Sequence, residues 1–160
     1  MNVRQNQAPT DNVMFFEDHP LESDNKLFLS LLREALSGTR TRVLHEKTIS
    51  RLERKLTRTF CRVVILDIMS EVPSDFRPIK GNAQGRVEPA MAGIEILRRI
   101  RADTYGNYEG SSVFIRSSRG EPHIRAECAE AGAAGYFQPG RQDFGLIERV
   151  KEVLAAGEPR

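Results

Sequence analysis

A chain of 160 residues is long enough for one compact domain with a buried core and short for two. Its composition, 39% hydrophobic and 29% charged, is that of an ordinary globular protein, and no apolar run reaches the roughly 18 residues of a membrane span. A formal charge of +2, from 24 basic and 22 acidic side chains, gives no support to a nucleic-acid partner. The polar N-terminus lacks the apolar stretch of a secretory signal. We therefore expect a cytoplasmic protein without membrane or nucleic-acid partners.

The chain opens with a polar segment, residues 1–11, which we expect to be a flexible tail before a single domain over 12–157. The apolar run 13–16 predicts a strand that is buried on both faces. Apolar residues at helical spacing over 28–36 predict a helix, which the glycine after it would end. Residues 158–160 form a short C-terminal tail in this interpretation.

The same strand and helix unit recurs along the rest of the chain. Short apolar runs predict the strands, and apolar residues three or four apart predict the helices. We expect strands at 42–44, 63–66, 113–115 and 133–137, and helices at 49–56, 94–100, 122–131 and 146–154.

Five alternating units of this kind predict an α/β fold with a doubly wound five-stranded parallel sheet. The strands are almost wholly apolar, and right-handed crossovers place helices on both faces of such a sheet. Sheets of this class bind ligands beyond the carboxyl ends of their strands. The residues that follow each strand are therefore the candidate functional residues.

Acidic side chains follow two of the predicted strands. Glu17 and Asp18 end the first strand, and Asp67 ends the third. If these strands are neighbours, the three carboxylates converge, and their repulsion calls for a cation, for which Mg²⁺ is the natural candidate because it prefers oxygen ligands. Ser117 follows the fourth strand and offers a hydroxyl to a phosphoryl oxygen, and Tyr136 lies in the fifth strand.

The same residues also have purely structural interpretations. Asp67 could begin a turn, and the acid pair before the first helix could cap that helix. Ser117 could be a loop hydroxyl and Tyr136 a core aromatic.

Cysteine and histidine show no ligand spacing. Cys61 and Cys128 lie in or beside apolar segments, which predicts two reduced core thiols rather than a disulfide or zinc site. Surface or loop roles are expected for His19, His45 and His123.

From about residue 13 to 154 the chain resembles the receiver domains of bacterial response regulators, the phospho-acceptor modules of two-component systems. The resemblance rests on motifs that stand in the expected order at the strand ends. These motifs are FFEDHP at 15–20, VVILDIM at 63–69, MAGIEILRRIR at 91–101, VFIRSS at 113–118 and AGAAGYFQP at 131–139. It implies a flavodoxin-like (βα)5 three-layer sandwich.

The resemblance also implies a role for each residue at the strand ends. Asp67 corresponds to the phospho-acceptor, and Glu17, Asp18 and Asp67 correspond to the Mg²⁺ ligands together with the backbone carbonyl of Met69. Ser117 matches the switch hydroxyl that turns toward the phosphoryl group.

Tyr136 matches the aromatic residue whose rotation reports the modified state. The donor would be a histidine kinase or a phosphotransfer protein, and the signal would pass to an unknown downstream protein. A homodimer is compatible with this role.

Two features depart from the receiver pattern. A lysine normally precedes the proline after the fifth strand, but here Gln138 precedes Pro139, so either Pro139 takes its position or Gln138 does after a deletion. The segment 71–89 is a long insertion after the acceptor strand. We expect it either to be a mobile lid or simple insertion, or to supply the missing cation, with Lys80 as the first candidate.

Three functions are compatible with these residues. The first is a stand-alone receiver, since no output domain follows residue 157 in this sequence. The second is a pseudo-receiver that binds partners without phosphorylation, which the missing lysine favours. The third is a small enzyme such as a phosphohydrolase or flavin carrier, disfavoured because Asp67 is not followed by a second acid two residues later and no glycine-rich phosphate loop follows the first strand.

Overall fold

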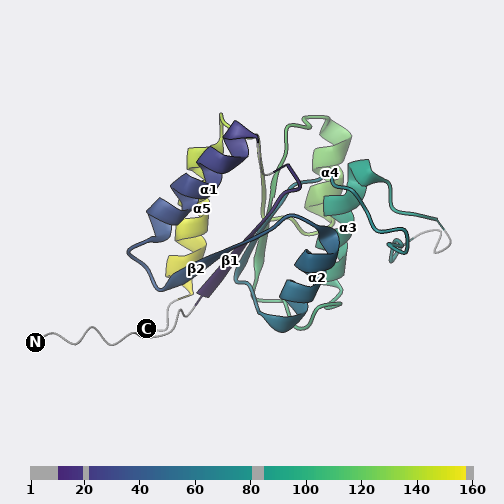
Figure 1. Cartoon of the computed structure of the whole chain (residues 1–160), viewed down its shortest axis with the longest axis horizontal. Coiled ribbons are helices and arrows are strands. Elements are labelled where there is room, and N and C mark those ends of the chain that lie inside the picture. Colours follow the sequence, from purple (N-terminus) through teal and green to yellow (C-terminus); the bar gives the residue numbers. More distant parts are fainter. Residues whose placement is uncertain (1–10, 20–21, 81–84, 158–160) are drawn as a thin grey trace, which may run out of the picture.

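The computed structural model describes residues 11–19, 22–80 and 85–157. All ten predicted elements are present in this part of the chain (Figure 1). The strands are β1 (Asp11–Phe16), β2 (Thr41–Glu46), β3 (Val63–Leu66), β4 (Ser112–Arg116) and β5 (Gly135–Phe137). The helices are α1 (Ser23–Leu36), α2 (Ile49–Arg58), α3 (Ala92–Arg101), α4 (Pro122–Glu130) and α5 (Asp143–Ala156), with a short 3₁₀ helix η1 (Pro89–Met91) before α3.

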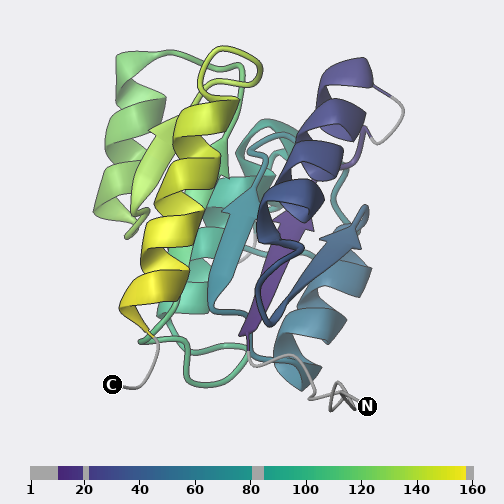
Figure 2. The ribbon, with the colours of Figure 1, turned by 90° about the vertical axis from the view of Figure 1, so that its left-hand side faces the viewer.

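The strands form one parallel sheet in the order β2-β1-β3-β4-β5. Helices α1 and α5 cover one face of this sheet, and α2, α3 and α4 cover the other (Figures 1 and 2). This is the predicted doubly wound three-layer sandwich. The second strand pairs on one side of β1, and β3, β4 and β5 follow on its other side. In sheets of this class, ligands bind at the carboxyl ends of the two strands where this change of side occurs, here β1 and β3.

Each central strand supplies both halves of the core because successive side chains point to opposite faces. Val13 and Phe15 of β1 pack under α1 and α5, whereas Met14 and Phe16 pack under the other three helices. All four residues of β3 are buried. The near-continuous apolar runs of the sequence are therefore explained by burial on both faces.

The elements extend beyond the apolar patterns that predict them. Helix α1 begins at Ser23, several residues before the first apolar residue of its pattern, and α5 begins at Asp143. β1 already begins at Asp11, inside the segment expected to be a tail. The remainder of that tail, residues 1–10, and the C-terminal residues 158–160 lie outside the described residues, as does Pro20 of the first motif.

We expect the inserted segment to be a mobile lid, a simple insertion or a source of charge; most of its described residues are exposed, and two are buried against the domain. Phe76 is 3% exposed and Val87 is 7% exposed, and the amide of Val87 donates to the carbonyl of Phe76 at 3.3 Å. The Arg99 guanidinium of α3 lies 4.0 Å from the centre of the Phe76 ring. The amide of Ile79 donates to the buried carboxylate of Glu95 at 2.8 Å. These contacts anchor the segment at Phe76, Ile79 and Val87, while residues 81–84 are outside the described part; whether the segment acts as a lid stays a prediction.

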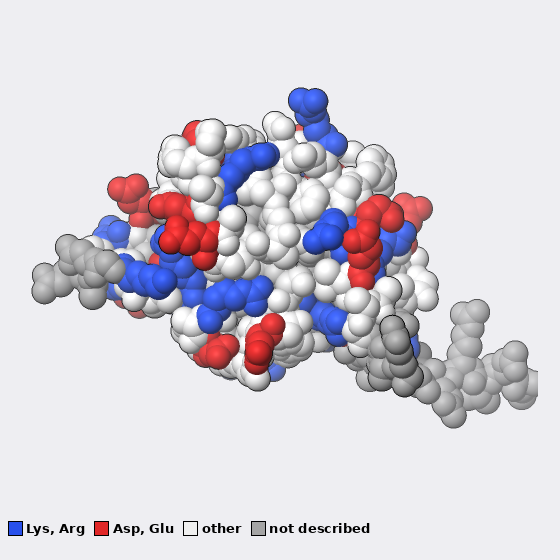
Figure 3. All heavy atoms as spheres, turned by 180° about the vertical axis from the view of Figure 1, so that it is seen from behind, with Lys and Arg blue, Asp and Glu red and all other residues white. Residues whose placement is uncertain are grey.

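Surface charges are mixed rather than segregated. On the face seen from behind in Figure 3, acidic and basic side chains are interspersed, in keeping with the near balance of the sequence. Cys61 and Cys128 are buried free thiols, as predicted. None of the described helices is long and apolar enough to span a bilayer.

Candidate functional site

The acids at the ends of β1 and β3 are held by hydrogen bonds that continue the sheet. The amide of Asp67 donates to the carbonyl of Phe16 at 3.1 Å, and the amide of Glu17 donates to the carbonyl of Glu46 at 3.3 Å. Backbone pairing therefore fixes Glu17 and Asp67 side by side, at the edge where ligands bind in sheets of this class.

Asp67 lies in an environment that disfavours its charge. The pKa of Asp67 is raised to about 6, chiefly by burial and to a lesser extent by the nearby carboxylate of Asp18. The backbone N–H groups of Ile68 and Met69 and the imidazole of His19 act in the opposite direction. Among the described residues, no lysine or arginine is a main contributor to this pKa. The carboxylate is thus only partly compensated by the protein.

One carboxylate oxygen of Asp18 accepts a hydrogen bond, and the other accepts none. Its Oδ2 accepts from the amide of Glu71 at 3.0 Å. Its Oδ1 is buried and accepts no hydrogen bond, although the Nε2 atom of the exposed His19 lies 3.2 Å away. Buried carboxylate oxygens in this state are costly unless a cation meets them. The neighbouring carboxylates of Asp18 and Asp67 have the chemistry that suits a Mg²⁺ ion, which commonly takes one or two carboxylates and keeps several waters.

Asp18 also opens into a hollow of about 500 Å³ at this end of the molecule. The hollow lies between the loops that follow β1, β2 and β3. Its polar lining includes His19, Lys47, Thr48 and Ser70. A small anionic or phosphorylated group could reach Asp18 through this opening.

The carboxylate of Glu17, by contrast, already has hydrogen-bond partners within the protein. Its side chain is 1% exposed, and its Oε2 accepts from the amide of His19 at 2.7 Å and from Nδ2 of Asn25 at 3.0 Å. Its Oε1 lies 3.1 Å from Nε2 of His45. Across the described ranges, no group of three or more His, Cys, Asp or Glu side chains is arranged to hold a metal. The structure thus brings together two of the three predicted carboxylates and engages Glu17 elsewhere.

The surface or loop role expected for His45 is therefore wrong. His45 belongs to β2, is largely buried, and stacks on Phe15 with ring centres 5.5 Å apart. It faces Glu17, so both residues belong to the interior between the sheet and α1.

A buried ionic network continues from Glu17, and the sequence analysis missed it. Arg116, 3% exposed at the end of β4, donates through Nη1 to Oδ1 of Asn25 at 2.7 Å. Its Nε and Nη2 donate to the two carboxylate oxygens of Asp143 at 2.8 and 3.2 Å. Its guanidinium also lies 4.4 Å from the centre of the Phe28 ring. A charged residue at the end of an otherwise apolar strand is the signal that could have revealed it, because buried arginines need partners.

Ser117 and Tyr136 lie close together, and both are hydrogen-bonded to the backbone of Arg119. Ser117 is 3% exposed, and its Oγ accepts from the amide of Arg119 at 3.2 Å. The Tyr136 hydroxyl donates to the carbonyl of Arg119. Burial raises the pKa of Tyr136, and a hydrogen bond with the Ser117 side chain opposes that effect. The guanidinium of Arg125 lies over the Tyr136 ring at 4.8 Å.

The structure does not bring Gln138 or Lys80 into contact with Asp67. Gln138 directly follows β5 and is exposed. Its backbone amide donates to Oε1 of Gln142 at 2.6 Å. Lys80 borders a separate hollow of about 400 Å³, which it shares with side chains of α3 and α4 such as Arg98 and Glu127. The cation expected from the inserted segment is therefore not found at Lys80.

The sheet order and the acids at the ends of β1 and β3 define a flavodoxin-like fold of the receiver type. Comparison with solved structures agrees. A response regulator from Thermotoga maritima matches 91% of this chain and 98% of its own at 18% identity, with a TM-score of 0.62. A CheY-like receiver domain from Methanospirillum hungatei matches 91% and 94% at 17% identity, with a TM-score of 0.61. The BeF3-activated DrrB receiver domain matches 90% and 97% at 21% identity, with a TM-score of 0.62.

At these identities the likeness establishes the fold, which is that of response-regulator receiver domains. A scan against protein-family models and a search of curated proteins find no match. The function therefore has to be argued from the site.

Proposed function

We propose that this chain is a receiver that accepts a phosphoryl group on Asp67 from a histidine kinase or phosphotransfer protein. The observation that carries the proposal is the pairing of a largely buried Asp67 with Asp18, whose Oδ1 has no hydrogen bond, at the carboxyl edge of the sheet. The Ser117 and Tyr136 pair at the end of the adjacent β4 and β5 supports it. In this proposal the protein acts in the cytoplasm and signals through protein contacts.

The chemistry asks for positioning and charge neutralisation, because phosphoryl transfer passes through a loose transition state. With a pKa raised to about 6, the Asp67 carboxylate is mostly ionised at neutral pH and more basic than an ordinary aspartate. The N–H groups of Ile68 and Met69 orient it. When bound to Asp18, Asp67 and the carbonyl of Met69, Mg²⁺ would neutralise charge on the phosphoryl oxygens. Glu17 would act as a positioning residue behind this site.

Phosphorylation would add a charge of roughly −2 at the edge of the sheet. The Ser117 hydroxyl lies at the end of the strand next to β3 and would donate to a phosphoryl oxygen. If its side chain turns to reach that oxygen, it would lose the bond that it accepts from the amide of Arg119, to whose carbonyl Tyr136 also donates. The loop between β4 and α4 would then rearrange, which offers a changed surface to a downstream protein.

A second function, the phosphorylation-independent pseudo-receiver, is favoured by one specific observation. Gln138 at the position of the usual lysine is exposed and uncharged, and the described residues leave Asp67 without a lysine or arginine as a main neighbour. In that case the same surface would bind its partner in one constant state.

Intact-mass spectrometry after incubation with acetyl phosphate and Mg²⁺ tests the proposal directly. The wild-type protein should gain a single phosphoryl increment, and the Asp67→Asn variant should gain none. Asp75→Asn, which changes an exposed aspartate of the inserted segment, is the matched control and should behave like wild type. An unmodified wild-type chain, under conditions that modify an ordinary receiver in the same tube, would favour the pseudo-receiver.

A further inference from the structure

Once Asp67 is phosphorylated, its site lacks one positive charge to balance the negative charges. A phosphoryl group on Asp67 carries roughly −2, and Asp18 adds a further negative charge beside it. A divalent ion would offset two of these charges. Gln138 is uncharged, and Lys80 borders another hollow. A cationic side chain from another part of the site would therefore complete the neutralisation.

Arg119 has a backbone that is bonded to both proposed switch residues. It lies in the loop between β4 and α4, two residues after Ser117. Its amide donates to Oγ of Ser117 at 3.2 Å, and its carbonyl accepts from the Tyr136 hydroxyl. Any rearrangement of these two side chains therefore releases or moves the backbone of Arg119.

The guanidinium of Arg119 reaches across to the segment that packs on Asp67. Its Nη1 donates to the carbonyl of Ala90 in η1 at 3.3 Å. Three residues later, Gly93 lies so close to Asp67 that a Cβ on it would be 2.0 Å from the Asp67 carbonyl oxygen. One residue before Ala90, the carbonyl of Pro89 accepts from the amide of Ser70 at 3.0 Å. The guanidinium thus lies between the β4–α4 loop and the wall of the Asp67 site.

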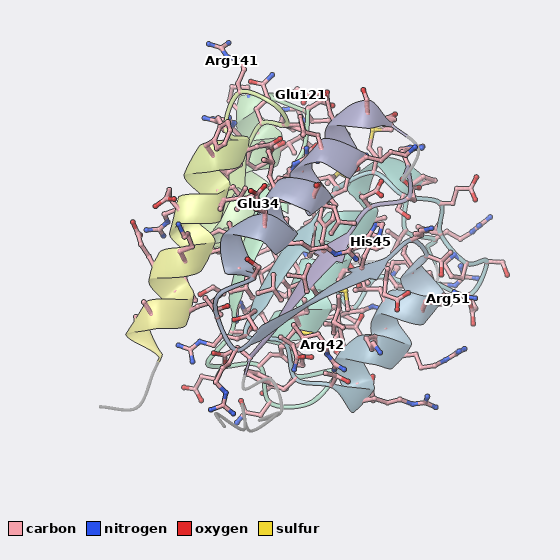
Figure 4. All side chains as sticks on the ribbon, turned by 60° about the vertical axis from the view of Figure 1, so that its left-hand side comes forward. Glu34, Arg42, His45, Arg51, Glu121 and Arg141 are labelled. Carbon is pink, nitrogen blue, oxygen red and sulfur yellow. The ribbon has the colours of Figure 1, made fainter. Side chains whose placement is uncertain are left out.

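The present ionic partner of Arg119 is one that it can exchange. Its Nε and Nη2 contact Oε1 of Glu121 at 3.3 and 3.0 Å, and the Glu121 side chain is 43% exposed. Glu121 lies at the carboxyl-edge end of the molecule (Figure 4). The Arg119 side chain is 25% exposed, so water and salt compete with this partly exposed pair, while Oε2 of Glu121 is buried without a hydrogen bond. A dianionic phosphoryl group offers a guanidinium a stronger, two-pronged partner.

We propose that Arg119 supplies the cation that the missing lysine would provide: its guanidinium leaves Glu121 and binds an oxygen of the phosphoryl group on Asp67. The inference rests on the proposed function. During phosphorylation an Asp67 oxygen forms a bond to phosphorus, and the bond from phosphorus to the donor breaks with its electron pair on the donor. During hydrolysis a water oxygen bonds to phosphorus, the Asp67 carboxylate leaves, and inorganic phosphate is released. The guanidinium stays protonated throughout.

The test compares phosphorylation rates with acetyl phosphate and Mg²⁺ by intact-mass spectrometry in five chains: wild type, Arg119→Ala, Arg119→Lys, Glu121→Gln and Arg149→Ala. Arg119→Ala should slow phosphorylation on the order of tenfold or more, as expected for the loss of one charged donor to a transition-state oxygen. Arg119→Lys should recover most of the rate. Glu121→Gln should be as fast as wild type or faster, because it removes the competing carboxylate. Arg149→Ala, which breaks an exposed ion pair on α5, is the matched control and should be unchanged.

The affinity for beryllofluoride, a phosphoryl analogue, gives a second readout that does not depend on turnover. It should fall in Arg119→Ala and be retained in Arg119→Lys. A phosphorylated wild type with an equally fast Arg119→Ala would overturn the role of Arg119 and leave Asp67 as acceptor. A wild type that is never modified on Asp67 would overturn the proposed function, and the role of Arg119 with it.

Discussion

Asp67 and Asp18 are adjacent carboxylates that the protein compensates unequally. Asp18 receives one backbone hydrogen bond and keeps one buried oxygen without any, while burial raises the pKa of Asp67 to about 6. Such an arrangement carries a cost in the free protein, because ionised carboxylates prefer water or a cation. A site of this kind is stabilised by what binds it.

The raised pKa of Asp67 predicts how stability depends on pH without metal. Between its ordinary value of 3.8 and about 6, the folded state keeps a proton that the unfolded chain has released. Stability from this group is therefore lost as the pH rises through that window, and stays constant above it. Asp67→Asn, which cannot ionise, should be more stable than wild type at pH 7.5 by on the order of 2–3 kcal/mol, since one pKa unit corresponds to about 1.4 kcal/mol. At pH 4 the difference should be small.

Urea unfolding at both pH values in the presence of a chelator measures this difference. Equal gains in stability at pH 4 and pH 7.5 would show that the effect of the substitution does not come from the ionisation of Asp67.

The contrasting environments of Glu17 and Asp18 predict different effects on Mg²⁺ binding. Asp18→Asn should raise the dissociation constant on the order of tenfold to hundredfold, because it removes one charge at contact distance from a divalent ion. Glu17→Gln should change it less than about threefold but destabilise the fold by about 1–3 kcal/mol, since it disturbs a buried hydrogen-bonded carboxylate. Calorimetric titration and urea unfolding measure the two effects. Equal losses of Mg²⁺ affinity would mean that Glu17 is a ligand after all.

For single residues, the sequence predicts the position in the fold better than it predicts the contacts of the side chain. Asp67 and Ser117 directly follow β3 and β4, and Tyr136 lies in β5; strands and their ends can be recognised from apolar periodicity. The direction of the Glu17 side chain depends on Asn25 and His45, which are distant along the chain and give no local signal. The same holds for the surroundings of Lys80, because the path of a long loop is set by tertiary packing.

The inserted segment contributes Phe76 and Val87 to the core, and Phe76 has the larger buried side chain. The ring is 3% exposed and lies under the Arg99 guanidinium, which also donates to Oε2 of Glu53 at 2.8 Å and to the carbonyl of Arg77 at 2.7 Å. Arg99 of α3 therefore joins the segment to both α2 and α3.

Phe76→Ala should destabilise the protein by about 3–5 kcal/mol, as is usual for a buried phenylalanine. The matched control is Phe144→Ala on α5, where the side chain is 70% exposed and the cost should stay within about 0.5 kcal/mol. Urea unfolding of both variants measures the effect. Similar small losses would mean that the segment packs only loosely in solution.

Apolar periodicity predicts where helices and strands lie better than it predicts where they begin. The first turn of α1 is polar, and in α5 the exposed Phe144 and Gly145 precede the buried pattern, so in both the pattern begins after the helix does. The third helix is predicted well because its apolar residues face the sheet in every turn, with Ile94, Leu97 and Ile100 all buried. The short β5 is the weakest element, since its three residues are all only partly buried.

For the molecule as a whole, the sequence was sufficient for the architecture. Five apolar strands alternating with helices allow few arrangements once right-handed crossovers are required, and the observed order is one of them. The buried network around Arg116 was not predictable in the same way, because it joins Glu17 after β1 to residues of α1, β4 and α5 that no pattern in the sequence connects.

That network also limits where the domain can bend. Arg116 is the last residue of β4, and its guanidinium is bonded to α1 through Asn25 and to α5 through Asp143. Its neighbour Ser117 begins the loop to α4. If that loop rearranges, we expect the bonds of Arg116 to keep the end of β4 in place against α1 and α5. The change would then lie in the loop that begins at Ser117 and in α4 beyond it.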